Sequence, residues 1–310
     1  MSGIPIIMDV DPGHDDAVAL MMACGAPGLD LLAVTTVAGN VELEKTTYNA
    51  LRVLSLIGRT DIPVAPGAAT PLTRDLHTAY EIHGESGLNG PDEIPAPPIA
   101  ADERDAVRLI ADVLEASSEP VTLIPTGPLT NIATFLRQHP EMREKIERIS
   151  LMGGSIGLGN TTPAAEFNVY VDPEAARVVF ESGLPITMSG LDVTHQAGAG
   201  PEERDRLREI GEAGRVIAGF LDFFAGAYEN TFGFDAPPLH DPVAVAAVLR
   251  LELLKTRAMR VDVECESDLT RGETVCDFYG ISGKPPNAGV GVELDREGFF
   301  ELLYETLRNL

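Results

Sequence analysis

The chain has 310 residues, of which 44% are hydrophobic, so it can bury a substantial core as one large α/β domain or two small ones. Its 48 acidic and 23 basic residues give a net charge of −25 at pH 7, which disfavours binding to nucleic acid or to an anionic membrane. The same charge favours a neutral or cationic substrate over a polyanion.

The cysteines and the N-terminus indicate the cellular compartment. Cys24, Cys265 and Cys276 form no metal-spaced pair, and their small number and wide separation fit a reducing cytoplasm. The N-terminus has no basic region and Asp9 interrupts its apolar run, so we expect no signal peptide. No stretch approaches the ~18–20 apolar residues that span a bilayer. The sequence therefore predicts a cytoplasmic protein without membrane contacts.

The segment 4–20, IPIIMDVDPGHDDAVAL, organises the rest of the chain. Its first apolar residues predict a short buried strand, after which a proline and a glycine turn the chain. Asp15 and Asp16 then begin a helix expected over 17–24, where acidic residues interact favourably with the free amide groups of the first turn.

Four aspartates lie within eight residues of this segment: Asp9, Asp11, Asp15 and Asp16. A single aspartate at a helix start is usually only a cap, but four carboxylates in so small a volume repel one another unless a cation joins them. Hard divalent cations such as Ca²⁺ and Mg²⁺ prefer oxygen ligands. The cluster therefore predicts a metal site rather than a solvated acidic loop.

Strands and helices alternate along the remaining chain. The expected strands are 29–37, 63–66, 121–125, 149–152, 185–189, 257–264 and 273–279. The expected helices are 43–57, 105–114, one that begins within the loop 126–136, 172–180, 202–228 broken near 211–214, 243–249 and 297–310, the last capped by Asp295. A long polar loop, 70–98, separates two of them, and loops of this length are usually functional or disordered.

This alternation predicts the α/β class, with a mostly parallel open sheet and helices on both faces. Without repeats or a convincing linker, we expect one domain over 1–310. Ligands of such sheets bind outside the carboxyl ends of the strands. The polar residues expected there are the 9–16 cluster, Asn40, Thr126, 152–160 and Asp192.

Six blocks of this sequence resemble the nucleoside hydrolase family, which cleaves the N-glycosidic bonds of ribonucleosides. DVDPGHDDAVAL is similar to the family's DxDxxxDD signature. The further blocks are TTVAGN (35–40), HGESGL (83–88), PTGPLTNIA (125–133), MGG…GN…AEFN (152–168) and HDP (240–242). Their order and spacing cover essentially the whole chain, and the resemblance implies the family's Rossmann-like fold.

The resemblance implies a Ca²⁺ site. Asp11, Asp16 and Asp241 would bind the ion through carboxylates and Thr126 through its backbone carbonyl, with water at the other positions. Because Ca²⁺ acidifies bound water less than Zn²⁺ does, a carboxylate must help to remove its proton, and Asp11 is the candidate base. Asp9 would orient its neighbours.

The resemblance also implies a ribose pocket. Asp15 would bind the 2′- and 3′-hydroxyl groups, and the pocket would be completed by Asn40, Asn160, Glu166, Asn168 and the backbone of Met152. Glu166 and Asn168 are two residues apart, so an extended chain would point both to one side. Asn131 is expected to hold its loop in place rather than to contact substrate.

The departing nucleobase must accept a proton or spread its negative charge. His240 is the family's candidate acid, because an imidazole titrates near neutral pH. His83 would contact the base or close a lid. Tyr228 and Phe232, one helical turn apart, would face the base or belong to the core. His14 has no implied role, and we expect it to be exposed.

The implied function is Ca²⁺-dependent hydrolysis of ribonucleosides to ribose and free nucleobase, by a homo-oligomer that is a dimer or a tetramer. The chain has no tryptophan, whereas the purine-specific branch of the family stacks the base between tryptophans. A broad-specificity or pyrimidine-preferring enzyme is therefore expected.

Two other classes compete with this interpretation. In a phosphohydrolase of the haloacid dehalogenase type, Asp9 would be the nucleophile, but Gly13 stands where that motif usually has Thr or Val. In a non-catalytic calcium-binding module of the EF-hand type, a loop starting at Asp9 would need Gly and Glu where the chain has His14 and Leu20. Neither alternative explains the Asp15–Asp16 pair.

Overall fold

The computed structural model describes residues 3–90 and 94–310 and contains two sheets. The strands are β1 (Ile4–Val10), β2 (Leu29–Thr36), β3 (Val64–Pro66), β4 (Val121–Pro125), β5 (Ile146–Met152), β6 (Ile186–Ser189), β7 (Leu254–Met259), β8 (Val261–Val263), β9 (Thr274–Cys276) and β10 (Ala288–Leu294). The helices are α1 (His14–Gly25), α2 (Leu43–Leu56), α3 (Tyr80–His83), α4 (Ala106–Ala116), α5 (Thr130–Gln138), α6 (Phe167–Val171), α7 (Pro173–Phe180), α8 (Leu191–Thr194), α9 (Pro201–Arg208), α10 (Glu212–Phe232), α11 (His240–Leu249) and α12 (Arg296–Leu307), with 3₁₀ turns at Pro140–Lys145 and Leu251–Leu253.

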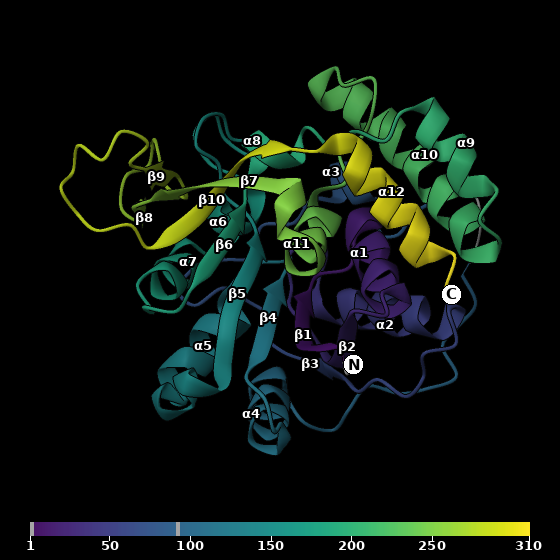
Figure 1. Ribbon diagram of the computed structural model, residues 1–310, viewed down its shortest axis with the longest axis horizontal. Helices are drawn as coiled ribbons and strands as arrows, with labels where there is room; N and C mark the ends of the chain where they lie inside the picture. Colours follow the sequence, from purple (N-terminus) through teal and green to yellow (C-terminus); the bar gives the residue numbers. More distant parts are fainter. Residues whose placement is uncertain (1–2, 91–93) are drawn as a thin grey trace.

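The larger sheet has eight strands in the order β3-β2-β1-β4-β5-β6-β10-β7 (Figure 1). Every neighbouring pair is parallel except the edge pair β10–β7, which is antiparallel. β8 and β9 form a separate antiparallel pair. The predicted mostly parallel sheet is therefore confirmed.

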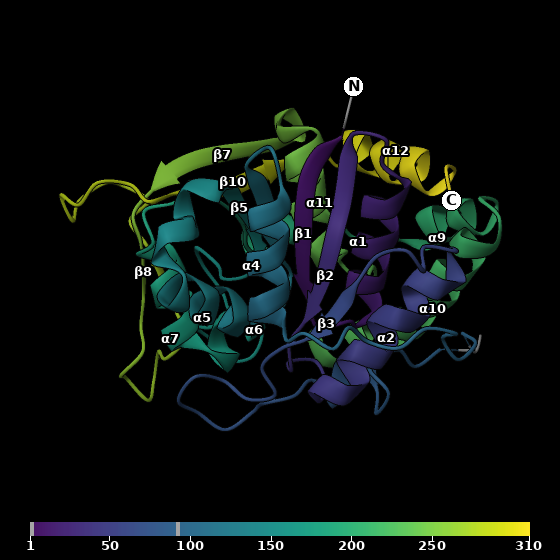
Figure 2. The ribbon, with the colours of Figure 1, turned by 90° about the horizontal axis from the view of Figure 1, so that it is seen from below.

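Helices cover both faces of this sheet, as the alternation predicted (Figure 2). Successive residues of β1 point to opposite faces: Ile6 and Met8 pack in a core with α1, α11 and α12, whereas Ile7 packs in a second core with α4, α5 and α7. Strands buried on both faces need mostly apolar residues, and β1 and β4 are accordingly hydrophobic apart from Asp9 in β1 and Thr122 in β4.

The carboxyl ends of the central strands bring distant polar residues together. Asp9, near the end of β1, lies in register with Thr35 on β2 and with Pro125 on β4, so the segments that follow these three strands begin side by side. The loop after β1 leads into α1 and its acidic first turn, and the loop after β4 begins with Thr126.

Three strand predictions were incomplete. β10 was not predicted, since Gly289 and Gly291 weaken its strand pattern; a Cβ at Gly291 would lie 2.9 Å from a side-chain carbon of Val193, so this glycine allows α8 to pack closely. The strand expected over 257–264 is divided between β7 and β8, which belong to different sheets. β5 begins three residues before the expected 149–152.

The predicted break in the helical segment 202–228 is confirmed, because α9 ends at Arg208 and α10 starts at Glu212. Within the loop predicted at 70–98, the short helix α3 packs against α10; residues 91–93 of that loop lie outside the described residues. Over the described ranges, no helix combines the length and apolar character that crossing a bilayer requires.

Candidate active site

Five buried aspartates meet at the carboxyl edge of the sheet. β1 and the loop that follows it supply Asp9 and Asp11, the first turn of α1 supplies Asp15 and Asp16, and the first turn of α11 supplies Asp241. None of them is more than 5% exposed. Chain segments 225 or more residues apart in sequence thus contribute to one acidic cluster.

Asp15, Asp16 and Asp241 each offer a carboxylate oxygen within 4.8 Å of the other two, a spacing that one metal ion could bridge. This trio contains Asp15 in place of Asp11, which the sequence assigned to the metal. Asp11 lies beside it: Oδ2 accepts a hydrogen bond from the backbone of Asn40 at 2.8 Å, whereas Oδ1 is buried and has no hydrogen-bond partner among the described residues.

The backbone around Asp11 is shaped to receive its carboxylate. A Cβ at Gly39 would lie 2.1 Å from Oδ2, and a Cβ at Gly127 would lie 2.5 Å from Oδ1. Any side chain at either position would therefore displace the carboxylate. Both glycines thus have a steric role beside the acidic cluster.

Burial raises the pKa of every member of the cluster. Desolvation raises the pKa of Asp9 and of Asp15 to about 7, despite hydrogen bonds that favour their charged forms. The pKa of Asp11 and that of Asp241 lie well above their usual range, first through desolvation and then through repulsion by other aspartates. The charged groups with the largest effect on these two pKa values are other aspartates.

A hard divalent cation fits this donor set. Only oxygen atoms converge here, they carry like charge, and the buried Oδ1 of Asp11 and Oδ2 of Asp9 have no hydrogen-bond partner among the described residues. A bound cation would supply the missing interaction for such oxygens and would remove the repulsion between the carboxylates.

Hydrogen bonds from outside the cluster hold the carboxylates in place. Thr126 Oγ1 donates to Asp16 Oδ1 at 2.7 Å, and Asn131 Nδ2 donates to Asp9 Oδ1 at 2.8 Å. The amide oxygen of Asn131 also accepts the backbone N–H of Ala68 at 2.8 Å. The structural role expected of Asn131 is therefore confirmed, and Asp9 is connected to the loop after β3.

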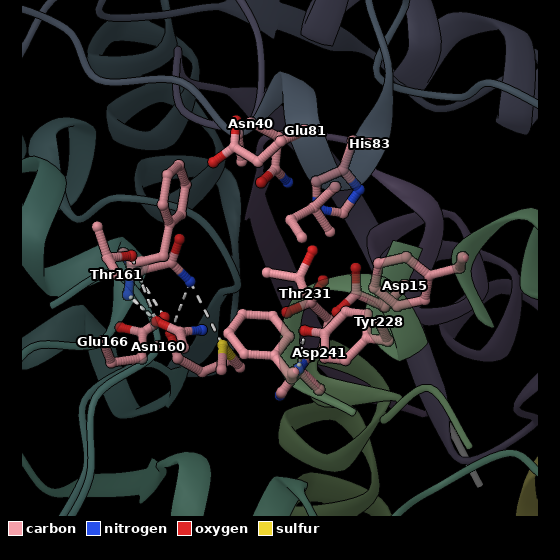
Figure 3. A pocket seen from close by; sticks show the side chains of 18 of the residues that line it. Asp15, Asn40, Glu81, His83, Asn160, Thr161, Glu166, Tyr228, Thr231 and Asp241 are labelled. Carbon is pink, nitrogen blue, oxygen red and sulfur yellow. Dashed lines mark hydrogen bonds between the residues drawn. The ribbon is translucent and has the colours of Figure 1, made fainter. Parts of the chain in front are cut away.

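A cavity of about 290 Å³ opens above the cluster (Figure 3). Twelve of the residues named from the sequence line it: Asp15, Asn40, His83, Thr126, Met152, Asn160, Glu166, Asn168, Tyr228, Phe232, His240 and Asp241. Asp11 and Asp16 lie beneath this lining and are buried.

The expected extended conformation around Glu166 and Asn168 was wrong. Glu166 is the N-cap of α6: its carboxylate accepts the backbone N–H groups of Asn168 and Val169, and also that of Gly154. Asn168 lies in the first turn of α6, where Nδ2 donates to the carbonyl oxygen of Thr126 at 2.7 Å. Both residues still line the cavity because the capped turn, rather than a strand, directs them there.

Several lining residues were not predicted from the sequence: His77, Ala79, Glu81, Ile82, Thr161, Phe167, Phe224 and Thr231. Two of them, Phe224 and Thr231, lie on α10 at helical spacing from Tyr228 and Phe232. This helical spacing was the available signal for both residues. Glu81 and Ile82 are brought to the cavity by α3, which the sequence did not predict.

His240 lies between two hydroxyl groups. Its Nε2 is 2.7 Å from the Tyr228 hydroxyl and its Nδ1 is 2.8 Å from Thr194 Oγ1. Burial, followed by the proximity of His195, lowers the pKa of His240 to about 3. The expectation that this ring titrates near neutral pH was therefore wrong, because desolvation outweighs its ordinary proton affinity.

The expected exposure of His14 was also wrong. Its side chain is completely buried against α10, where its ring stacks on Phe223 and Phe224. His83 is 6% exposed and lies between His14 and the cavity, with a ring-centroid distance of 5.3 Å to His14. The two histidines lie 69 positions apart in the chain and meet only in the folded protein.

The raised aspartate pKa values predict a pH-dependent stabilisation by metal. Asp9 and Asp15 hold their protons up to about pH 7 in the folded metal-free chain but release them near pH 3.8 when unfolded, so their contribution to stability is lost as pH rises through this range. Added Ca²⁺ should therefore raise the melting temperature more at about pH 8 than at about pH 5, where protons compete for the oxygens.

Differential scanning calorimetry measures the melting temperature with Ca²⁺ and with chelator at both pH values. Titrating groups remote from the site affect both samples equally, so they do not change the shift caused by Ca²⁺. Asp16→Asn should reduce the shift at the higher pH. An equal shift at the two pH values would contradict the prediction.

Comparison with known proteins identifies the family. The family model described as inosine-uridine preferring nucleoside hydrolase matches residues 6–301. The chain is 51% identical over 307 residues to the pyrimidine-specific ribonucleoside hydrolase RihA of Escherichia coli O7:K1, and it is equally similar to RihA of Escherichia fergusonii; each alignment covers 98% of both chains.

Solved structures agree with this relationship. A purine-preferring ribonucleoside hydrolase from Gardnerella vaginalis superposes with a TM-score of 0.91 at 35% identity, covering 98% of each chain. The plant nucleoside hydrolase PpNRh1 superposes with a TM-score of 0.90 at 32% identity and the same coverage. The chain that forms this cavity above five buried aspartates thus belongs to the inosine-uridine preferring nucleoside hydrolase family, and the protein hydrolyses nucleosides.

Proposed function

We propose that this enzyme cleaves the N-glycosidic bond of pyrimidine ribonucleosides, giving ribose and the free base. The observation that carries the proposal is the mixed lining of the cavity. The carboxylates of Asp15 and Asp241 line it together with the aromatic side chains of Tyr228 and Phe232 on α10. A nucleoside has matching parts, a polyhydroxylated sugar and a flat, largely apolar base.

The pyrimidine preference has two further supports. The Escherichia coli relative at 51% identity is named as pyrimidine-specific, and the chain has no tryptophan to stack a purine. The Gardnerella neighbour at 35% identity is named as purine-preferring, which makes purine nucleosides the alternative substrates. A broad-specificity enzyme would accept both classes.

We assign the metal ligands to Asp11, Asp16, Asp241 and the Thr126 carbonyl, with Ca²⁺ as the ion. The Thr126 carbonyl accepts one hydrogen bond, from Asn168, and therefore keeps a lone pair. When bound, the ion would neutralise the carboxylates, hold ribose hydroxyl groups and lower the pKa of a coordinated water. Asp15, whose oxygen lies within the same 4.8 Å group, would bind the 2′- and 3′-hydroxyl groups.

Asp11 would act as the general base toward the attacking water. Its Oδ1 has no protein partner among the described residues, and burial together with Asp16 raises its affinity for a proton. Departure of the base leaves positive charge on the sugar ring, and the buried carboxylates would stabilise that charge. Asn40, Asn160, Glu166, Asn168 and the backbone of Met152 would bind the remaining sugar groups.

His240 would protonate the leaving base as part of a hydrogen-bonded chain. With its pKa lowered to about 3, the ring is neutral at neutral pH, so it would relay to Tyr228 a proton supplied by water rather than store one. The Tyr228 hydroxyl, which lies on the cavity side of this chain, would present that proton to the base. His83, which packs beside Phe224, would also contact the substrate.

Homo-oligomerisation and a cytoplasmic location stay predictions. Exposed apolar side chains near β9 would support association with other copies: Tyr279 is 81% and Ile281 is 88% exposed. Such exposed apolar side chains are candidates for burial in an interface.

A substrate panel tests the proposed activity. Uridine and cytidine should release reducing sugar with a kcat/KM at least about tenfold above those of inosine and adenosine, and chelator should abolish all four activities until Ca²⁺ is restored. A preference for inosine would overturn the pyrimidine assignment. Full activity in chelator would overturn the metal assignment.

Charge-neutral substitutions test the ligands separately from the fold. Asp11→Asn, Asp16→Asn and Asp241→Asn should each lower kcat by about 10²–10⁴-fold, because each removes a carboxylate from the reacting centre. Asp30→Asn is the matched control, since Asp30 is exposed near the opposite end of β2. Near-normal rates for all three site variants would show that these carboxylates do not form the catalytic centre.

His240→Ala tests proton transfer to the base. Uridine hydrolysis should fall by about 10²–10⁴-fold, whereas an activated nitrophenyl riboside, whose leaving group needs no proton, should react at close to the wild-type rate. Equal losses for both substrates would exclude His240 from leaving-group activation. The Tyr228→Phe variant should show the same selectivity.

A further inference from the structure

His14 is a buried histidine that does not line the cavity. It lies in the first turn of α1, and its ring is enclosed by three aromatic side chains of α10: Phe220 at its edge and Phe223 and Phe224 stacked on it. Because the side chain is completely buried, it does not contact substrate. Any effect on the reaction therefore passes through a neighbouring group.

The hydrogen bonds of His14 define which ring nitrogen carries the hydrogen. Nε2 lies 2.6 Å from the backbone carbonyl oxygen of Asn89, and a carbonyl can only accept, so Nε2 is the N–H donor. The ring is completely buried among aromatic side chains, where a charged imidazolium would be costly, so the ring is neutral. A neutral imidazole has one N–H group, so Nδ1 of His14 has a free lone pair.

Nδ1 of His83 lies next to that lone pair. The two Nδ1 atoms are 3.1 Å apart, and two bare nitrogens at this distance would repel each other, so Nδ1 of His83 carries the hydrogen and donates it. The backbone N–H of His14 also points at His83 Nδ1, which would favour the opposite assignment. That contact is 3.4 Å long, and the shorter contact between the rings is the stronger one.

The space around His83 fixes the ring in this position. A Cβ at Gly13 would lie 2.4 Å from His83 Nδ1, so this glycine makes room for the edge of the ring that faces His14. The other face contacts Phe224 at a centroid distance of 5.3 Å. Nε2, on the far edge, has no hydrogen-bond partner among the described residues, and His83 lines the cavity.

From this geometry we infer that His14 is a positioning residue that sets the tautomer of His83. With its hydrogen on Nδ1, His83 presents the bare Nε2 to the cavity as a hydrogen-bond acceptor for an O–H or N–H group of the nucleoside. The inference rests on the proposed binding of substrate in this cavity. The inferred role gives a reason for a histidine at position 14, between the aspartates of the DxDxxxDD motif, where the motif itself specifies no particular side chain.

Nitrogen NMR of the full-length protein labelled with [¹⁵N]histidine and loaded with Ca²⁺ tests the tautomer directly. His83, assigned by loss of its signals in His83→Asn, should show a protonated Nδ1 and an unprotonated Nε2. A protonated Nε2 on His83, or two protonated nitrogens on His14, would overturn the inference. This result does not depend on whether the enzyme prefers pyrimidines.

Two variants of His14 separate its two hydrogen bonds. Asn at this position places an amide oxygen near the site of Nδ1 and can accept from His83, whereas Gln reaches Asn89 but leaves His83 without its acceptor. We expect His14→Gln to raise the KM for uridine roughly tenfold with a smaller change in kcat, because this variant loses the one hydrogen bond from His83. The KM of His14→Asn should stay within about threefold of the wild-type value.

The NMR spectra should follow the kinetics: the wild-type His83 tautomer should persist in His14→Asn and mix with the other tautomer in His14→Gln. Calcium affinity, measured by calorimetry, should be the same in both variants and serves as the control for the neighbouring aspartates. Equal KM values in the two variants, or a larger loss in His14→Asn, would overturn the inference. Inactivity of the wild-type enzyme on every nucleoside would instead contradict the proposed function and leave the tautomer result standing.

Discussion

Repulsion between buried carboxylates is the constraint on which the rest of this structure depends. Asp11, Asp15, Asp16 and Asp241 are removed from water, and the charged groups with the largest effect on the pKa of Asp11 and of Asp241 are other aspartates. Desolvation of so many like charges is costly, so the protonated forms are favoured until a cation is present. The fold maintains this arrangement because the carboxyl ends of β1 and β4 and the starts of α1 and α11 all lie at one edge of the sheet.

The surrounding contacts fix positions rather than add charge. Gly39 and Gly127 leave space for one carboxylate, and Asn131 and Thr126 donate hydrogen bonds to two others. Neutral donors of this kind orient a carboxylate and leave its charge available to a cation or to a developing positive charge on substrate. A Lys or Arg in the same places would neutralise the cluster and compete with both.

His240 and His14 have environments that their sequence positions did not suggest, whereas His83 lines the cavity. His240 is neutral at neutral pH and joins two hydroxyl groups, so its chemistry depends on Tyr228. His83 and His14 share a hydrogen bond whose direction follows from a carbonyl oxygen at Asn89. In all three cases α10 supplies the apolar wall that excludes water, and this wall determines how each imidazole can act.

The sequence by itself determined the parallel sheet, the order of most elements and the identity of the polar residues at the strand ends, because hydrophobic period, turn residues and acidic helix starts are local properties. Tertiary structure alone decided which of these residues are desolvated and which meet. It placed Asp15 within the carboxylate trio, turned Glu166 and Asn168 into a capped helix, added β10 to the sheet and buried His14 beneath α10. Desolvation and the direction of a hydrogen bond depend on atoms far away in the chain, so no local pattern encodes them.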